Sequence, residues 1–195
     1  GPYVLLAWND GQGFEEGISA DIQGYGYSTD FGQTFVPGGD LPPPAGGWIW
    51  TSDPVITVNE KTGEFYYLAL INTENNTQNG IGIIRGTFSG TTFTWNTPHI
   101  VVSGSNSTVF YDKLWAVADS SSGRLYLTNT RFFAAENEIQ FRRTTGAWNQ
   151  WSAPSVMTNP SSNGIVQGSR PAVGPAGEVY VTWKEIGPVD ADFMK

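Results

Sequence analysis

The sequence repeats itself at a spacing that few folds accommodate. Residues 53–70, DPVITVNEKTGEFYYLAL, align without a gap on residues 113–130, KLWAVADSSSGRLYLTNT, so the offset between the two copies is 113 minus 53, or 60. Residues 170–185 form a third copy with a shorter turn, and residues 3–10, YVLLAWND, form a partial fourth copy. Each complete copy has two apolar runs around a turn that contains glycine. The repeat therefore predicts a series of antiparallel hairpins.

A second repeated element lies between these hairpins. It ends in an aromatic residue at Phe35, Phe93 and Trp151, and the spacings of these ends (93 minus 35 and 151 minus 93) are both 58. A period of this length, with four strand-like runs per unit, is typical of a β-propeller in which each repeat is one antiparallel blade. Such blades bury their faces only against their neighbours.

We therefore predict an all-β fold, a β-propeller with four-stranded antiparallel blades. Residues 53–70 supply strands A and B of a blade, residues 81–87 strand C, and residues 91–95 strand D. About three and a half blades of a six-bladed ring are expected, and these are too few to close a ring of the usual four to eight. The chain is then a fragment, several chains complete the ring, or the exposed edges are capped in another way.

The whole chain is interpreted as one propeller segment without a separate domain. A composition of 24 Gly and 12 Pro with only 14% charged residues agrees with a turn-rich all-β chain. The expected blade parts within residues 1–195 are 1–37, 48–102, 113–156 and 169–195.

One polar turn in the first blade carries a recognisable motif. Its sequence YSTDFGQTF resembles the Asp-box, S-x-D-x-G-x-T-W/F, a repeat (BNR) of the sialidase superfamily of β-propellers, and the hairpins also resemble blades of that superfamily. In that family the Asp-box is structural and lies away from the active site. The residue types agree, because Ser and Asp can bond backbone N–H groups of the turn, Gly tolerates positive φ, and the aromatic can pack inward. We interpret the motif as a fastener between strands C and D, formed by Ser28, Asp30, Gly32, Thr34 and Phe35.

Charge and composition exclude several classes of partner and site. The formal net charge of −8 disfavours nucleic acids and anionic membranes, and no apolar run reaches the roughly 20 residues of a membrane span. The chain has no cysteine, which excludes disulfides and cysteine-zinc sites, and its single histidine, His99, cannot form a histidine metal site alone. We expect no cofactor. The segment 9–21 has oxygen ligands for Ca²⁺ without a regular EF-loop spacing, and a solvated acidic loop is the alternative.

The acidic residues concentrate on one predicted face. In sialidase-like propellers the loops from strand B to C and from D to A form the functional face. Ten of the 18 carboxylates fall in expected B-to-C loops: Asp10, Glu15, Glu16, Asp21, Glu74, Glu136, Glu138, Glu185, Asp190 and Asp192. A sialidase instead needs arginines for its substrate carboxylate, and the family's F-R-I-P motif is absent. The sequence therefore leaves the catalytic residues unknown.

Some residues on this face are nevertheless candidates for a polar site at the ring centre: Asp53, Tyr111, Asp112, Arg131 and Arg170. Loop capping and solvated charge are the alternative explanation, because clustered charge marks function only statistically. Five loop aromatics are candidates for stacking on sugar rings, although at least half should pack between blades: Trp48, Trp50, Tyr111, Phe132 and Phe133.

Two functions remain open from the sequence. The first is a non-catalytic propeller that binds carbohydrate or cell-surface glycoconjugate, or that mediates assembly, with self-association through open blade edges. The second is an exo-glycosidase of sialidase type whose remaining catalytic groups lie outside this segment. The resemblance implies a bacterial protein that is secreted or at the cell surface.

Overall fold

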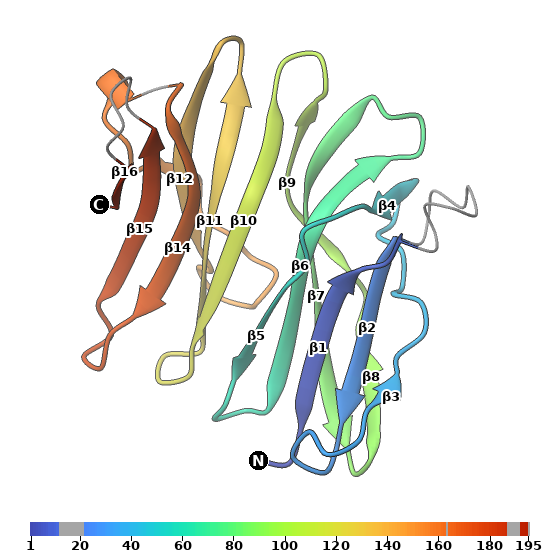
Figure 1. Cartoon of the computed structure of the whole chain (residues 1–195). Helices are drawn as coiled ribbons and strands as arrows, with labels where there is room; N and C mark the ends of the chain where they lie inside the picture. The colour runs from blue at the N-terminus through green and yellow to red at the C-terminus, as the bar shows by residue number, and fades with distance from the viewer. Residues whose placement is uncertain (12–21, 163, 187–191, 195) are drawn as a thin grey trace.

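The computed structural model describes residues 1–11, 22–162, 164–186 and 192–194, the last three by their backbone alone. Four antiparallel sheets stand side by side in chain order, from the N-terminal sheet in blue to the C-terminal sheet in red (Figure 1). A short 3₁₀ turn, η1 (Pro160–Ser162), precedes β14, and no helix within the described residues is long and apolar enough to cross a membrane. The prediction of an all-β fold with antiparallel blades is confirmed.

We name the four sheets blades 1 to 4. Blade 1 contains β1 (Val4–Asn9), β2 (Gln23–Ser28) and β3 (Val36–Pro37). Blade 2 contains β4 (Trp48–Trp50), β5 (Val55–Asn59), β6 (Glu64–Thr73), β7 (Gln78–Ser89), β8 (Thr92–Trp95) and β9 (His99–Ser105). Blade 3 contains β10 (Phe110–Asp119), β11 (Arg124–Phe133), β12 (Glu136–Arg143) and β13 (Ser155–Val156). Blade 4 contains β14 (Val166–Val173), β15 (Val179–Ile186) and β16 (Asp192–Met194).

Blade 2 has four strand positions although six strands are assigned to it. β4 and β5 both pair with β6, so together they form an interrupted strand A, and β8 and β9 both pair with β7 as an interrupted strand D. Strand D is longer than the expected residues 91–95, because it resumes at His99 and continues to Ser105. Pro98 lies in the gap, where its missing N–H interrupts the ladder.

The two ends of the blades are built from different connections. The turns from strand B to C and the connections from D to A lie at the upper end in Figure 1. The A-to-B hairpin turns, the C-to-D turns and the N-terminus lie at the lower end. We use the terms upper end and lower end in this sense below.

The blades pack face to face through alternating residues of their central strands. In β6, Tyr67 and Ile71 belong to the core between blades 1 and 2, whereas Tyr66 and Leu68 belong to the core between blades 2 and 3. Three of these four side chains are fully buried, and Tyr66 is 2% exposed. A strand buried on both faces explains why residues 65–71 are continuously apolar.

The A-to-B turns support the alignment of the repeats. Gly63, Gly123 and Gly177 occupy the same turn position in blades 2, 3 and 4, with φ of 71°, 75° and 85°. A left-handed backbone favours glycine at all three positions. The Glu60 N–H of one turn donates to Ser120 Oγ of the next turn at 2.9 Å, which ties neighbouring blades at their lower end.

Candidate functional site

The inner strands of blades 2, 3 and 4 share a backbone irregularity. Asp53, Lys113 and Gly168 have φ of 56°, 47° and 70°. Each lies two residues before the position where strand A pairs again with strand B, at Val55, Trp115 and Arg170. Bulges of this kind redirect side chains at a strand edge. The same irregularity therefore recurs at equivalent places in three consecutive inner strands, which contact one another.

A hollow lies beside these bulges. Its volume is about 360 Å³, and its lining includes Trp8, Asn9, Asp53, Lys113, Trp115 and Arg170. A neighbouring cavity of about 250 Å³ shares Asn9 and adds Asp10, Thr51 and Ser52. We call these two cavities together the axial groove.

Asp53 is fixed in the groove by contacts to two other blades. Its carboxylate oxygen Oδ2 accepts a bond from Lys113 Nζ at 2.9 Å, and its backbone N–H donates to Asn9 Oδ1 at 3.0 Å. The hydrogen bond to Asp53 raises the pKa of Lys113 above its usual value. Gln167 Nε2 donates to Asp112 Oδ2 at 3.3 Å, so Asp112 is also tied to the next blade.

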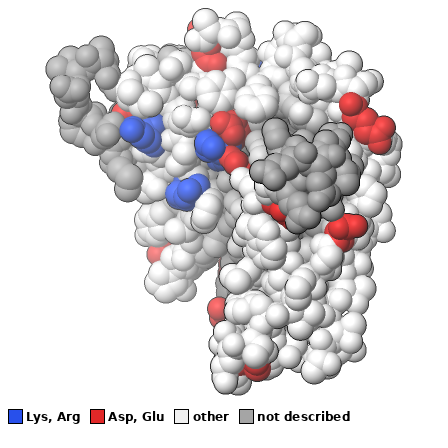
Figure 2. Space-filling model, turned by 45° about the vertical axis from the view of Figure 1, so that its right-hand side comes forward, with Lys and Arg blue, Asp and Glu red and all other residues white. Residues whose placement is uncertain are grey.

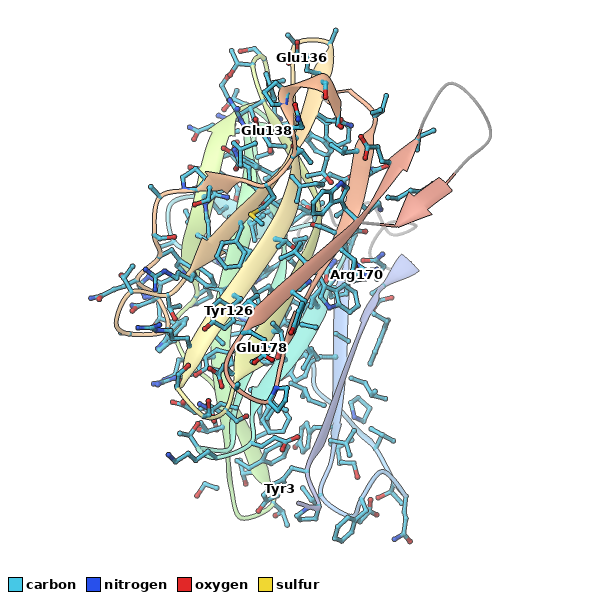
Figure 3. All side chains as sticks on the ribbon, turned by 90° about the vertical axis from the view of Figure 1, so that its left-hand side faces the viewer. Tyr3, Tyr126, Glu136, Glu138, Arg170 and Glu178 are labelled. Atoms are coloured by element: carbon cyan, nitrogen blue, oxygen red, sulfur yellow. The ribbon has the colours of Figure 1, made fainter. Side chains whose placement is uncertain are left out.

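Arg170 differs from the other basic residues of the site. Its guanidinium lies 3.6 Å from the ring centroid of Trp115, a cation–π contact. The three ion pairs found among the described residues do not include Arg170. Figure 2 shows several Lys and Arg side chains close to Asp and Glu side chains near the middle of one face, and Figure 3 places Arg170 between the two ends of the blades.

Trp115 supplies the exposed aromatic surface of the groove. Trp8 also borders the groove, but Leu5 and Ala7 of β1 face the core between blades 1 and 2, so the Trp8 ring lies on the other face of blade 1, with Leu6. Trp8 is 45% exposed and Trp115 is 36% exposed. The Trp8 ring lies against β2 at Gly24, where an added Cβ would be only 2.3 Å from the indole nitrogen. Glycine at this position is what lets the ring lie against the strand.

The structure brings some of the predicted polar residues together and separates others. Asp53 and Arg170 line the axial groove, with Asp112 beside them. Tyr111 is 7% exposed and lines the next cavity, of about 320 Å³. Arg131 lies apart, because it pairs with Glu138 at 3.2 Å and its guanidinium stacks 4.5 Å from the Phe133 ring centroid.

Three of the five aromatic residues expected to stack on sugars are buried, Tyr111 among them. Trp48 and Trp50 are 8% and 3% exposed and pack between blades 1 and 2, so they cannot stack on a sugar. Sequence reasoning missed Trp8 and Trp115. A signal was present for Trp115, since the repeat alignment places this large aromatic opposite Val55 of the preceding copy.

The acidic residues expected on the upper face are not uniformly exposed. Glu136 and Glu138 lie at the upper end of blade 3 (Figure 3), but Glu138 is only 8% exposed and is paired with Arg131. Four of the predicted carboxylates lie outside the described residues: Glu15, Glu16, Asp21 and Asp190. Most of the segment proposed for Ca²⁺ also lies outside them, and the described residues contain no cluster of His, Asp and Glu suited to a metal ion.

The polar turn of blade 1 lies at the lower end, away from the groove. Asp30 accepts bonds from Thr34 Oγ1 at 2.6 Å and from Ser28 Oγ at 2.7 Å, and Ser28 Oγ accepts the Gly32 N–H at 2.9 Å. The bonds from Thr34 and Ser28 lower the pKa of Asp30 to about 2. Phe35 does not pack inward as expected, because it is 43% exposed.

The copy of this turn in blade 2 is stabilised by different contacts. Phe93, the aromatic equivalent to Phe35, is 9% exposed within the core between blades 1 and 2. Its centroid lies 4.6 Å from that of Trp95 in an edge-to-face contact. Hydrogen bonds hold the first copy, whereas aromatic packing holds the second.

Comparison with known proteins supports the fold. No protein-family model matches the sequence, and a comparison with curated proteins finds no match. The solved structure of an exo-1,5-α-L-arabinanase from a bovine ruminal metagenomic library matches with a TM-score of 0.52 at 13% identity, over 95% of this chain and 62% of the enzyme. That of an exo-β-1,3-galactanase from Phanerochaete chrysosporium, with β-1,3-galactotriose, gives 0.56 at 15% identity, over 96% of this chain and 42% of the enzyme.

These two structures bear on the fold of the chain. Both proteins are β-propeller glycoside hydrolases, which agrees with a partial propeller, and neither is a sialidase. The chain spans less than two thirds of either enzyme. At such low identity the likeness shows the fold alone.

Proposed function

We propose that this chain is the saccharide-binding part of a β-propeller protein of the glycoside-hydrolase type, with the sugar in the axial groove. The observation that carries the proposal is the groove itself, where the partly exposed Trp115 meets the Asp53–Lys113 pair. A sugar ring has an apolar face and a rim of hydroxyls. It suits a hollow that combines aromatic surface with a few fixed polar groups.

The similar solved structures support a neutral sugar. They are named as an arabinanase and a galactanase, the latter with galactotriose. The positively charged residues of the groove also favour a neutral sugar over an acidic one. Asp53 neutralises Lys113, so Arg170 alone is left to attract a sugar carboxylate, whereas the sialidase resemblance implies a cluster of arginines.

The test measures binding of neutral arabino- and galacto-oligosaccharides and of a sialyl-oligosaccharide, by calorimetry and tryptophan fluorescence. We expect Trp115→Ala to weaken neutral-sugar binding about tenfold, because an aromatic contact is worth about 1 kcal/mol beyond its buried area. Tyr180→Ala, at a residue 59% exposed outside the groove, is the matched control and should leave sugar binding unchanged. Failure to bind any of these sugars would contradict the proposal.

An exo-glycosidase is the second candidate function. Asp10 and Asp53 line adjoining parts of the groove, and glycoside hydrolysis uses two carboxylates flanking the scissile bond. Aryl arabinosides, galactosides and sialosides test this candidate. Turnover that is lost in both Asp10→Asn and Asp53→Asn, with sugar binding retained, would favour the enzyme. Binding without turnover of any of these substrates favours the binding module.

A further inference from the structure

We propose that the sugar chain held in the axial groove continues outward over the upper end of blade 3, onto a second subsite made of three phenylalanines. The ligand would then be an elongated neutral oligosaccharide instead of a single sugar. This inference rests on the proposed function, because it concerns the substrate class of the same groove.

The second subsite consists of Phe110 from β10 and Phe132 and Phe133 from the end of β11. We call it the aromatic subsite. Phe110 is 47% exposed, and its ring centroid lies 6.3 Å from that of Phe132. The three rings line a cavity of about 230 Å³ together with residues 106–109 and Ala134. None of these lining residues is charged, so the subsite offers apolar ring surface with an uncharged polar rim.

The loop that carries Phe110 is held in place before any ligand arrives. Asn106 Nδ2 donates to the Asn76 carbonyl at 2.7 Å, and Asn106 Oδ1 accepts from Asn79 Nδ2 at 2.7 Å. The hydroxyls of Ser105 and Ser107 lie 2.8 Å apart. A loop fixed by its own hydrogen bonds loses little conformational entropy on binding.

An intermediate cavity shares lining residues with both the aromatic subsite and the axial groove. This cavity of about 320 Å³ shares Thr51 and Ser52 with the groove and shares Phe110 with the aromatic subsite. In Figure 3 Arg170 lies near mid-height and Glu136 lies at the upper end of blade 3.

The sizes of the cavities favour a ligand of several units. Each measures between about 230 and 360 Å³, near the lower limit of roughly 300 Å³ for one small-ligand site. A row of such cavities offers more space than one sugar ring occupies. The lining of the aromatic subsite is uncharged, and Arg131, which stacks on Phe133, is neutralised by Glu138, so with a net charge of −8 an acidic polymer has no advantage there.

The experiment compares linear neutral galacto- and arabino-oligosaccharides, from disaccharide to hexasaccharide, on the whole chain by calorimetry. We expect affinity to rise with length, and Phe110→Ala and Phe133→Ala each to remove about five- to tenfold of the hexasaccharide affinity while leaving the disaccharide unchanged. Phe31→Ala is the matched control, since Phe31 is 73% exposed at the lower end and should affect neither ligand. Unchanged thermal melting of each variant shows that the fold is retained.

The outcomes separate the two proposals. Disaccharide binding with no gain for longer chains, or a gain that survives both phenylalanine substitutions, overturns the aromatic subsite and leaves the axial groove standing. A chain that binds none of the saccharides overturns the proposed function and this inference with it.

Discussion

Asp30 shows how one side chain can hold a turn. Its carboxylate accepts the backbone N–H of Thr34 at 2.9 Å in addition to the two hydroxyl bonds described above. Because every donor favours the charged form, the pKa falls from the ordinary value of 3.8 to about 2. The folded state therefore binds this proton less readily than the unfolded state does.

This shift predicts a pH-dependent contribution to stability. A depressed carboxyl pKa stabilises the fold above the unfolded value, near pH 4, and the contribution is lost as the pH falls to about 2. We expect Asp30→Asn to lower the melting temperature by a few degrees at neutral pH, with the difference shrinking between pH 4 and pH 2. Asp40→Asn, an exposed carboxylate outside the turn, is the control for thermal melting. If the difference in melting temperature stayed constant down to pH 2, the charge of Asp30 would not be the cause of the stabilisation.

Asparagines near the start of strand C connect successive blades. Asn79 Oδ1 accepts the Tyr111 N–H at 2.9 Å, and Asn137 Oδ1 accepts the Val166 N–H at 3.2 Å. The spacing of the two asparagines, 137 minus 79, equals the 58 of the repeat. Each is the second residue of its strand and bonds the inner strand of the next blade. They position the inner strands at the upper end, close to the cavities described above.

Replacement of Asn79 should destabilise the protein. Asn79 is 2% exposed and also donates to the Val109 carbonyl at 2.6 Å, so Asn79→Ala leaves buried polar groups unpaired. We expect a loss of about 2 kcal/mol in the free energy of unfolding, measured in urea. Asn96→Ala removes an exposed side chain that accepts from Arg85 at 3.3 Å, and should cost less than about 0.5 kcal/mol. Equal losses in the free energy of unfolding for Asn79→Ala and Asn96→Ala would contradict the role of Asn79 in joining the blades.

The whole molecule has two outer sheet faces with apolar side chains. On blade 1, Leu6 and Trp8 are 46% and 45% exposed, and on blade 4, Tyr180 and Ile186 are 59% and 51% exposed. The faces of blade 2, which neighbouring blades cover, contain fully buried side chains such as Leu68. Contiguous exposed apolar surface favours association.

We therefore predict that this chain self-associates through its outer blades. Sedimentation equilibrium should show a mass that rises with protein concentration, and Leu6→Lys with Ile186→Lys should shift the chain to the monomer. Ile100→Lys, at a residue 39% exposed on the outer strand β9, is the control and should leave the association unchanged. A monomer at every concentration would contradict the prediction.

The sequence by itself determined the repeating blade. The constant offset between the copies and the shared turn glycines identify hairpins, and the continuous apolar run at residues 65–71 marks a strand covered on both faces. These features are local, because strand period and turn conformation depend on neighbouring residues along the chain. They could not tell Trp50, which is buried between blades, from Trp115, which is open in the groove.

Only the tertiary structure decided where the site lies. Asp53, Lys113 and Arg170 come from three different blades, and they meet because bulges interrupt three adjacent inner strands at the same level. A bulge depends on how each strand pairs with its neighbour, and the run of cavities depends on how the blades pack. Neither follows from the alternation of apolar and polar residues. For that reason the sequence identified the blades, whereas the groove and the aromatic subsite emerged from the assembled sheets.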